Sequence, residues 1–525
     1  MKTKKNLFLV LLLSMVLALA ACGSDKSSKE DEKGNTDAPA EATEGGDLVY
    51  VTPADAPTLD PHGVNDTASN NATSQIYERL TDYAEDGSVI PMLATEFSAV
   101  DDTTWEFKLR EGVKFHDGTD FNAEAVKASL DRILDPEFAS PKIVVVNMIS
   151  SVEVVDEYTV HIKTEKPFAP LPAHLAHNAG SIIAPSAIEE ENNGGKTVSE
   201  NPIGTGPFKL EKWNTGDSIQ FAKNQDYWGE KAKADTLTFK VVPDQSTRVA
   251  MLETGEAHAL LLGSSDVARV EAMQGIELDR VSSTRMDYLG FNMQKAPFDN
   301  EKVRQAIAMA INKEDIVDGI LDGQGLAAIG PLAPTVVGNS QELEPLAYDV
   351  EEAKKLLAEA GFEDGFKTSL QVNTGNAERE NIAKLIQAQL APIGIEVEID
   401  LIEWGTFLEK TAVGEHELFI LGWTTVTGDA DYGLYALFHS SMFGEAGNRA
   451  FYKNDRVDEL LDLARTEADQ EKRNVAYKEI SEILIKESPM VYLQHPDFVH
   501  GMNGIDGLFV NSSGTPFFKD VVITK

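Results

Sequence analysis

The sequence contains a single cysteine, Cys22, among its 525 residues, and it has far fewer basic than acidic side chains. A lone cysteine cannot form a disulfide within the chain. Lys and Arg number 46 against 86 Asp and Glu, which gives a net charge of −40. Such a chain would repel nucleic acid and offers no basic surface that could release its counterions. We therefore expect no nucleic-acid partner.

Common catalytic and metal-binding motifs are also missing. The sequence has no G-x-S-x-G elbow, no H-E-x-x-H pair and no G-x-x-x-x-G-K-[ST] loop, and its ten histidines are scattered. Asp429, Asp431 and Gly433 imitate the start of a calcium loop, but Ser440 stands where a bidentate Glu belongs. We expect no enzyme activity, no cofactor and no bound metal.

The longest apolar run is too short to span a bilayer. Lys2, Lys4 and Lys5 precede 15 residues, Leu7 to Ala21, that are apolar except for Ser14, whereas a membrane-spanning helix needs about 20 apolar residues. This pattern is typical of a secretory signal over residues 1–21. Its removal takes three lysines away and leaves 43 basic against 86 acidic residues, a net charge of −43.

The end of the run, Leu19 to Cys22, resembles the lipobox of bacterial lipoproteins. The resemblance implies cleavage before Cys22 and acylation of its thiol, with acyl chains such as palmitate anchoring the protein to the outer face of the cytoplasmic membrane. Residues 23–46 are polar, charged and without apolar periodicity. With Cys22 they form an expected lipidated, flexible acidic linker over residues 22–46.

From Leu48 onward, helical and strand patterns alternate without a repeat, which predicts a mixed α/β fold. Asp349 is suited to cap a helix that ends before Gly361. Residues 395–399 alternate with period two, and the continuously apolar residues 418–423 predict a buried strand. The polar loop 424–429 then follows a strand end, where ligands bind in open α/β sheets.

Four segments together resemble the peptide, nickel and glutathione binding proteins of ABC importers, solute-binding family 5. They are residues 58–61 (TLDP), 109–118 (LREGVKFHDG), 202–208 (PIGTGPF) and 297–306 (PFDNEKVRQA). The likeness runs from about Leu48 to the C-terminus. It implies a two-lobed, hinged receptor of the type II periplasmic-binding-protein kind with an extra inserted α+β domain.

On this basis we expect lobe I in three pieces, residues 47–80, 203–288 and 496–525. The inserted domain occupies residues 81–202, and lobe II occupies residues 289–495. The expected partners are a small peptide-like solute and the transmembrane subunits of an ABC permease, and we expect a monomer.

The segments that bear on the ligand look most like the glutathione-binding branch. Val426 stands where dipeptide receptors of the family have an aspartate for the ligand ammonium, and their carboxylate-binding arginine is absent near residues 373–376. Residues 64–69 and 422–432 instead resemble the glutathione branch. Oligopeptide, dipeptide or nickel-chelate binding are the alternatives within the family. A peptidase or a surface interaction protein is the alternative of another class.

The resemblance implies a set of ligand-binding residues with different roles. Asp66 would accept from a ligand ammonium, and Arg285 or Arg379 would neutralise a carboxylate. Trp404 and Trp423 would sandwich the peptide backbone, or else pack in the core. The full expected set is Asn65, Asp66, Thr67, Ser69, Arg285, Tyr288, Asn292, Arg379, Trp404, Trp423, Thr424, Thr425, Thr427 and Asp429. Tyr288 and Asn292 are equally compatible with packing at the hinge.

Overall fold

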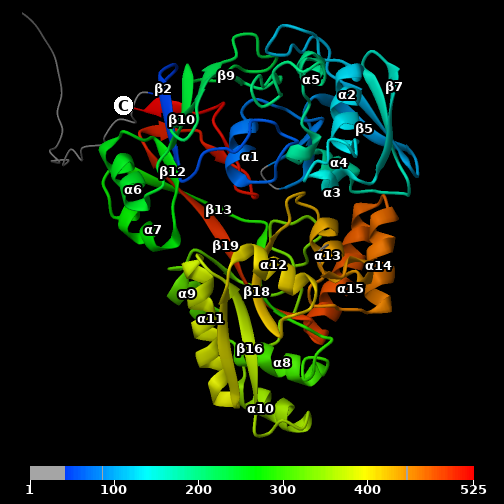
Figure 1. The fold of residues 1–525 in the computed structure, drawn as a ribbon, viewed down its shortest axis with the longest axis vertical. Coiled ribbons are helices and arrows are strands. Elements are labelled where there is room, and N and C mark those ends of the chain that lie inside the picture. The colour runs from blue at the N-terminus through cyan, green and yellow to red at the C-terminus, as the bar shows by residue number, and fades with distance from the viewer. Residues whose placement is uncertain (1–41, 85–86, 445–446, 525) are drawn as a thin grey trace, which may run out of the picture. The chain divides into compact units, whose positions relative to one another are not determined.

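The computed structural model describes residues 42–84, 87–444 and 447–524. The predicted signal sequence, Cys22 and most of the predicted linker lie outside the described residues. The described chain is a mixed α/β protein, as predicted (Figure 1).

One large sheet of twelve strands organises the fold, in the order β17-β16-β18-β14-β19-β12-β2-β11-β10-β9, with β13 and β15 also paired to β19. Its strands are β2 (Asp47–Thr52), β9 (Phe208–Asn214), β10 (Ser218–Lys223), β11 (Thr236–Val241), β12 (Ala259–Leu261), β13 (Ile276–Ser282), β14 (Arg285–Phe291), β15 (Gly325–Ala327), β16 (Phe366–Asn373), β17 (Ile395–Ile402), β18 (Leu418–Thr424) and β19 (Met490–Asn503).

The long strand β19 connects two halves of this sheet. Its first residues pair with β14, and its last residues pair with β12 and β13 (Figure 1). We call the half with β2 and β9–β13 lobe I, and the half with β14–β18 lobe II. The chain passes between the halves twice, once within β19 and once from β13 to β14. Both β13 and β14 pair with β19, so the two connecting segments lie side by side.

A four-stranded antiparallel sheet, in the order β5-β6-β8-β7, forms a separate layer that we call the insert. Its strands are β5 (Ala94–Asp101), β6 (Thr104–Leu109), β7 (Ile149–Asp156) and β8 (Thr159–Thr164). The helices of the insert are α2 (Ala123–Leu134), α3 (Ile143–Val146), α4 (Leu171–Leu175), the 3₁₀ helix η1 (Asn178–Gly180) and α5 (Pro185–Asn192).

Short strands complete the chain in small sheets. They are β1 (Ala42–Thr43), β3 (Thr81–Tyr83), β4 (Val89–Pro91), β20 (Ile505–Asp506), β21 (Phe509–Val510), β22 (Pro516–Phe517) and β23 (Val522–Thr524). The order β1-β23-β20 brings the start and the end of the described chain together in one sheet.

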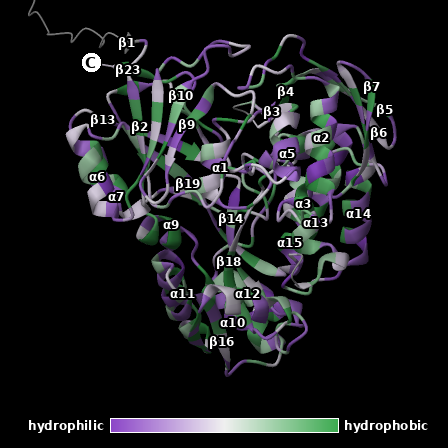
Figure 2. Cartoon of the chain, turned by 45° about the horizontal axis from the view of Figure 1, so that its top comes forward, coloured by the Kyte–Doolittle hydropathy of each residue, from purple (hydrophilic) through white to green (hydrophobic). Residues whose placement is uncertain are grey.

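The remaining helices cover the two halves of the large sheet. In lobe I they are α1 (Thr67–Thr73), α6 (Gln245–Thr254) and α7 (Ser264–Glu271). In lobe II they are α8 (Glu301–Ala310), α9 (Glu314–Ile320), α10 (Val350–Glu359), α11 (Ala377–Leu390), η2 (Ala391–Ile393), α12 (Trp404–Ala412), α13 (Ala430–Phe438), η3 (Ser440–Met442), α14 (Asp455–Thr466) and α15 (Gln470–Glu487). Many of these helices carry hydrophilic and hydrophobic residues side by side, as expected for elements with one buried face (Figure 2).

Alternation along the central strands separates two cores in lobe II. On β14, Tyr288 belongs to the cluster packed with α13–α15, whereas its neighbour Leu289 belongs to the cluster packed with α8 and α11. Gly290 follows them on the same face as Tyr288, and a Cβ there would come within 2.3 Å of the ring of Phe419. Only glycine fits this position, so strand and ring pack in direct contact.

Several predicted elements are confirmed in detail. Asp349 caps α10 by accepting from the backbone N–H groups of Glu351 and Glu352, and Gly361 follows the helix with φ +87°. Residues 395–399 lie in β17, and residues 418–423 lie in β18.

Candidate functional site

A cavity of about 270 Å³ lies between lobe I, the insert and the carboxyl edge of the lobe II strands. Three chain segments far apart in the sequence form most of its wall: the start of α1, the turn around η1, and the loop between β21 and β22. The lining residues are Asn65, Asp66, Thr67, Asn70, Asn71, Ser74, Arg79, Tyr83, Ala176, His177, Asn178, Leu261, Arg285, Thr424, Val426, Phe498, Asn511, Ser513, Gly514, Thr515 and Phe517. Of the residues expected from the sequence, Asn65, Asp66, Thr67, Arg285 and Thr424 meet here.

Asp66 is the acidic group of this cavity. It is the N-cap of α1, and its Oδ1 accepts from the backbone N–H of Ser69 at 3.0 Å. Its Oδ2 is buried and has no hydrogen-bond partner among the described residues. A buried carboxylate oxygen without a donor is costly unless a ligand supplies one. Asp66 is therefore placed to accept from a cationic ligand group.

Arg285, at the start of β14, is one of two guanidinium groups that line the cavity. Its Nε and Nη2 donate to Asp287 Oδ1 at 3.1 and 2.7 Å, and its side chain stays 29% exposed. Burial would lower the pKa of Arg285, but the carboxylate of Asp287 holds it above its ordinary value. Asp287 is itself buried and also accepts from Gln494 at 2.7 Å. The guanidinium is thus fixed by its partner while part of it faces the cavity.

Arg79 is the second guanidinium, and reading the sequence did not identify it. It follows α1, is only 3% exposed, and donates to Asn178 Oδ1 at 3.2 Å and to Asp82 Oδ2 at 2.8 Å. Its Nε has no partner among the described residues. No motif around Arg79 signals this role, because Asn178 reaches it from the insert, 99 residues away.

The rest of the lining is mainly uncharged and polar. Burial holds the pKa of His177 well below its ordinary value, so its ring is neutral at pH 7. Asn70 Oδ1 accepts from the buried ammonium of Lys142 at 2.7 Å, which orients the amide of Asn70. Lys142 also donates to the carbonyl of Pro61 at 2.6 Å. Burial lowers the pKa of Lys142 to about 8. Amides and hydroxyls of this kind can fix a peptide backbone.

Four of the expected residues do not line the cavity. Ser69 is buried in α1, and Tyr288 is 1% exposed with its ring against Phe419. Asn292 donates to the carbonyls of Gly414 and His416 at 2.9 and 3.0 Å and holds that turn. Arg379 Nη1 donates to Asn373 Oδ1 at 2.9 Å, and its Nη2 lies 4.0 Å from Oδ1 of Asp287, the carboxylate that also binds Arg285.

The two tryptophans have different surroundings. Trp404 is 44% exposed at the start of α12 and stacks on Phe407 at 5.9 Å. Trp423 is partly buried near the end of β18, 5.5 Å from the ring of Tyr432, and its Nε1 has no partner among the described residues. Neither ring lines the cavity of 270 Å³.

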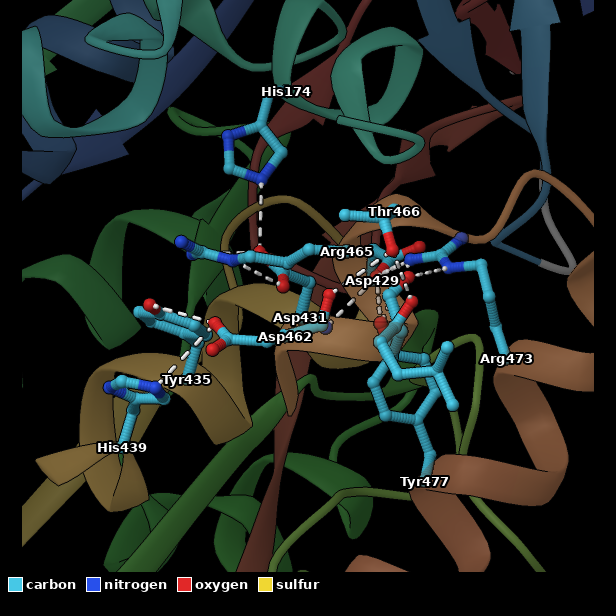
Figure 3. A network of polar contacts seen from close by, with 12 residues as sticks. His174, Asp429, Asp431, Tyr435, His439, Asp462, Arg465, Thr466, Arg473 and Tyr477 are labelled. Atoms are coloured by element: carbon cyan, nitrogen blue, oxygen red, sulfur yellow. Dashed lines mark hydrogen bonds and ion pairs between the residues drawn. The ribbon is translucent and has the colours of Figure 1, made fainter. Parts of the chain in front are cut away.

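Three expected residues of the loop after β18, Thr425, Thr427 and Asp429, are buried. The backbone N–H of Thr425 donates to the carbonyl of Thr284 at 3.1 Å. Asp429 caps α13 and accepts from Arg473 at 2.6 Å (Figure 3). Its carboxylate is neutralised inside lobe II, away from the lining of the cavity.

Next to Asp429, side chains of lobe II meet the insert. The buried Asp431 accepts from Arg465 Nε and Nη2 at 2.8 and 3.1 Å, and His174 Nε2 lies 3.9 Å from it (Figure 3). The carbonyl of Arg465 accepts from the backbone N–H of Ala169 at 2.8 Å, and its guanidinium lies 5.5 Å from the ring of Phe168. These contacts join the insert to lobe II beside the cavity.

Within the described parts of the chain, no group of three or more His, Cys, Asp or Glu side chains is arranged to hold a metal ion. Across those same residues, none of the helices has the length and apolarity that crossing a bilayer requires.

Comparison with known proteins identifies the class. The family model for bacterial extracellular solute-binding proteins, family 5 Middle, matches residues 88–445. The chain therefore belongs to the family 5 bacterial extracellular solute-binding proteins, as the sequence resemblance predicted.

Individual relatives lie within this family. The glutathione-binding protein GsiB of Salmonella typhi is 36% identical over 456 residues, which cover 85% of this chain and 88% of that protein. Among solved structures, the periplasmic binding protein DppA of Helicobacter pylori in complex with the peptide STSA is 34% identical, with a TM-score of 0.77 over 92% of this chain and 99% of that one. HbpA2 of Haemophilus parasuis is 30% identical, with a TM-score of 0.84 over 91% and 100%.

Proposed function

We propose that this protein is a lipid-anchored extracytoplasmic receptor that captures glutathione or a closely related small peptide and delivers it to an ABC importer. The observation that carries the proposal is the charge arrangement in the cavity. Asp66, whose Oδ2 has no hydrogen-bond partner among the described residues, lines a space that the guanidinium-bearing residues Arg79 and Arg285 also line.

Glutathione at neutral pH carries one ammonium and two carboxylates, and the cavity lining offers one carboxylate and two guanidinium groups, each of which also donates to an aspartate, Asp82 or Asp287. An ammonium donates to carboxylates, and guanidinium groups donate to carboxylates in a fixed fork. The amides of Asn70 and Asn178 and the hydroxyls of Thr67 and Thr424 would bind the two peptide units. The 36% identity to a glutathione-binding protein supports the same ligand.

The size of the cavity favours a short ligand. Its volume of about 270 Å³ is close to the lower limit of ordinary ligand pockets, about 300 Å³. An apolar side chain, Val426, lines it where dipeptide receptors of the family have an aspartate. A free dipeptide would therefore lose its usual ammonium partner. His416, the residue that a nickel ligand would involve, is 1% exposed with its ring against Phe419.

Thermal unfolding of a soluble form that starts after Cys22 tests the ligand. The panel comprises glutathione, oxidised glutathione, dipeptides, a pentapeptide and NiCl₂. A ligand present at a hundred times its dissociation constant raises the unfolding free energy by about 2.7 kcal/mol. We expect a large rise in Tm with glutathione. A rise only with the pentapeptide or with NiCl₂ would refute the ligand but keep the receptor class.

The anchor rests on the signal sequence and on Cys22. Two or more acyl chains hold a protein on a membrane stably, whereas one alone does not. In cells that express the full chain, we expect the protein in the membrane fraction and labelled palmitate on Cys22. Cys22→Ala should release it or leave its precursor uncleaved. Unlabelled wild-type protein in the soluble fraction would contradict the anchor. We further propose that the receptor is a monomer that docks on permease subunits, which light scattering of the soluble form checks.

A further inference from the structure

A second cavity, of about 340 Å³, lies directly beside the ligand cavity. The two cavities share four lining residues, Ser74, Arg79, Tyr83 and Phe517. A single layer of side chains therefore separates them. A group attached to a ligand in the first cavity would pass only that layer to reach the second.

Aromatic and other apolar side chains dominate the lining of the second cavity. Tyr77, Tyr83, Tyr227, Phe509 and Phe517 contribute to it, and the rings of Phe509 and Phe517 stack with their centroids 5.7 Å apart. Such a surface gains free energy when an apolar group covers it.

Most polar groups of this second cavity have partners; the exceptions among the described residues are the hydroxyl of Tyr77 and Nε of Arg79. The buried carboxylate of Glu78 accepts from Tyr227 at 2.6 Å, from Trp228 at 2.8 Å and from Thr205 at 2.7 Å. Asp82 accepts from Arg79 at 2.8 Å, and Lys519 donates to Asp520 at 2.8 Å. An apolar occupant would leave these hydrogen bonds intact.

Arg79 crosses the shared wall and remains fixed. Its Nη1 donates to Asn178, which lines the ligand cavity, and its Nη2 donates to Asp82, which lines the second cavity. Because Arg79 is only 3% exposed and Tyr83 donates to the carbonyl of Ala173 at 2.6 Å, the half-buried Phe517, which makes no side-chain hydrogen bond, is the wall residue that we expect to move aside for a substituent.

We propose that the second cavity receives the apolar substituent of a glutathione thioether whose glutathione part occupies the ligand cavity. This inference rests on the proposed function. A thioether keeps the ammonium and both carboxylates of glutathione and adds an apolar group at sulfur. Its charged part therefore matches the first cavity, and its substituent matches the second.

Isothermal titration of the soluble form with glutathione and with S-methyl, S-hexyl and S-benzyl glutathione tests this. We expect S-hexyl and S-benzyl glutathione to bind about tenfold more tightly than glutathione or more, which corresponds to about 1.4 kcal/mol. S-methyl glutathione, too short to reach the second cavity, should bind like glutathione.

Two variants locate the effect. Ala84→Trp places a large ring in the second cavity, and Phe509→Ala removes one of its aromatic walls; neither residue lines the ligand cavity. In both variants the ratio of the S-hexyl glutathione affinity to the glutathione affinity should fall toward one. Ala358→Trp, on the exposed face of α10 in lobe II, is the matched control and should keep the wild-type ratio. Thermal unfolding confirms that each variant is folded.

Equal affinity for glutathione and its S-hexyl thioether would overturn the inference and leave the proposed function intact. A preference for S-hexyl glutathione that persists in both cavity variants would overturn it as well. The tripeptide Ala-Phe-Ala, which has an apolar side chain but no thioether, is titrated alongside, and tighter binding of this peptide than of the thioethers would also overturn the inference. If neither glutathione nor any thioether binds, the proposed function and this inference both fail.

Discussion

At the scale of single residues, the proposed site is built from side chains that also stabilise the fold. Asp66 caps α1 with one carboxylate oxygen and leaves the other without a donor. Arg285 is held by Asp287, and Asn70 by Lys142, before any ligand arrives. Such preorganisation lowers the entropy that binding must overcome.

Replacing Asp66 by asparagine separates its two roles. Asparagine is as good an N-cap as aspartate, so α1 should remain capped and the unfolding free energy nearly unchanged. The loss of the negative charge should weaken glutathione binding about tenfold or more, because hydrogen bonds to charged groups contribute about 1.5–3 kcal/mol. Titration calorimetry measures the affinity.

The control for this substitution is Asp349→Asn, at the N-cap of α10 in lobe II. It should leave glutathione affinity at the wild-type value. Full affinity in Asp66→Asn would show that another group accepts from the ammonium.

Buried histidines predict a loss of stability in mild acid. His500 is 0% exposed, neither ring nitrogen has a partner among the described residues, and burial lowers its pKa from 6.5 to about 4. Below pH 6.5 the unfolded chain takes up the proton before the folded one does. The stabilisation is complete above pH 6.5 and is lost as the pH falls from there toward 4, by about 1.4 kcal/mol per pH unit.

Urea unfolding at pH 7.5 and pH 5 measures this effect. His500→Leu should reduce the difference in unfolding free energy between the two pH values by about 2 kcal/mol. A difference as large as in the wild type would mean that His500 takes up its proton in the folded state as well. Burial also lowers the pKa values of His62 and His416 to about 3. These two histidines therefore lower the stability in acid equally in the wild type and in His500→Leu.

At the scale of elements, the sequence predicts those with local signals. The cap at Asp349, the alternation of β17 and the apolar run of β18 suffice to place their elements. β19 is different, because Pro496 interrupts its pattern and a proline cannot donate to a sheet. The strand continues because pairing with β14 ends at Gln494 and pairing with β13 begins at Asp497. Only the long-range pairing makes these 14 residues one strand.

The same limit applies to the site. Asp66, Thr67 and Thr424 stand in segments that resemble the family, and they line the cavity. Arg79, His177 and the loop at residues 511–517 carry no motif, because the tertiary fold brings them together from lobe I, the insert and the C-terminal segment. Sequence periodicity does not predict which distant segments come into contact in the folded chain.

The contact between the insert and lobe II should contribute to affinity without touching the ligand. Asp431 and Arg465 form an ion pair within lobe II and face His174 and Phe168 of the insert, so replacing one of the pair alone would leave an unpaired charge. The double variant Asp431→Asn with Arg465→Gln avoids this. We expect ligand affinity to fall about three- to tenfold, mainly through faster dissociation, because most affinity changes appear in the dissociation rate. Stopped-flow kinetics measure both rates.

The matched control is Arg456→Gln with Glu479→Gln, an exposed pair between α14 and α15 with a 2.9 Å contact. Exposed pairs contribute little, so both rates should match the wild type. If the Asp431 and Arg465 variant also binds and releases ligand at wild-type rates, the contact has no part in retention.

At the scale of the whole molecule, composition and family agree. The acidic charge and the lone cysteine at the end of the predicted signal sequence are consistent with a receptor outside the cytoplasm. The family model and the relatives place the chain among extracellular solute-binding proteins. The identity of the proposed ligand rests on the charges of Asp66, Arg79 and Arg285, and their role can be tested directly.

The most direct measurement is a crystal structure of the soluble form with glutathione. We expect glutathione in the cavity of about 270 Å³, with its ammonium nitrogen within about 3 Å of Asp66 Oδ2. One carboxylate should face Arg285 and the other should face Arg79. Glutathione bound elsewhere, or with a carboxylate beside Asp66, would contradict the proposed site.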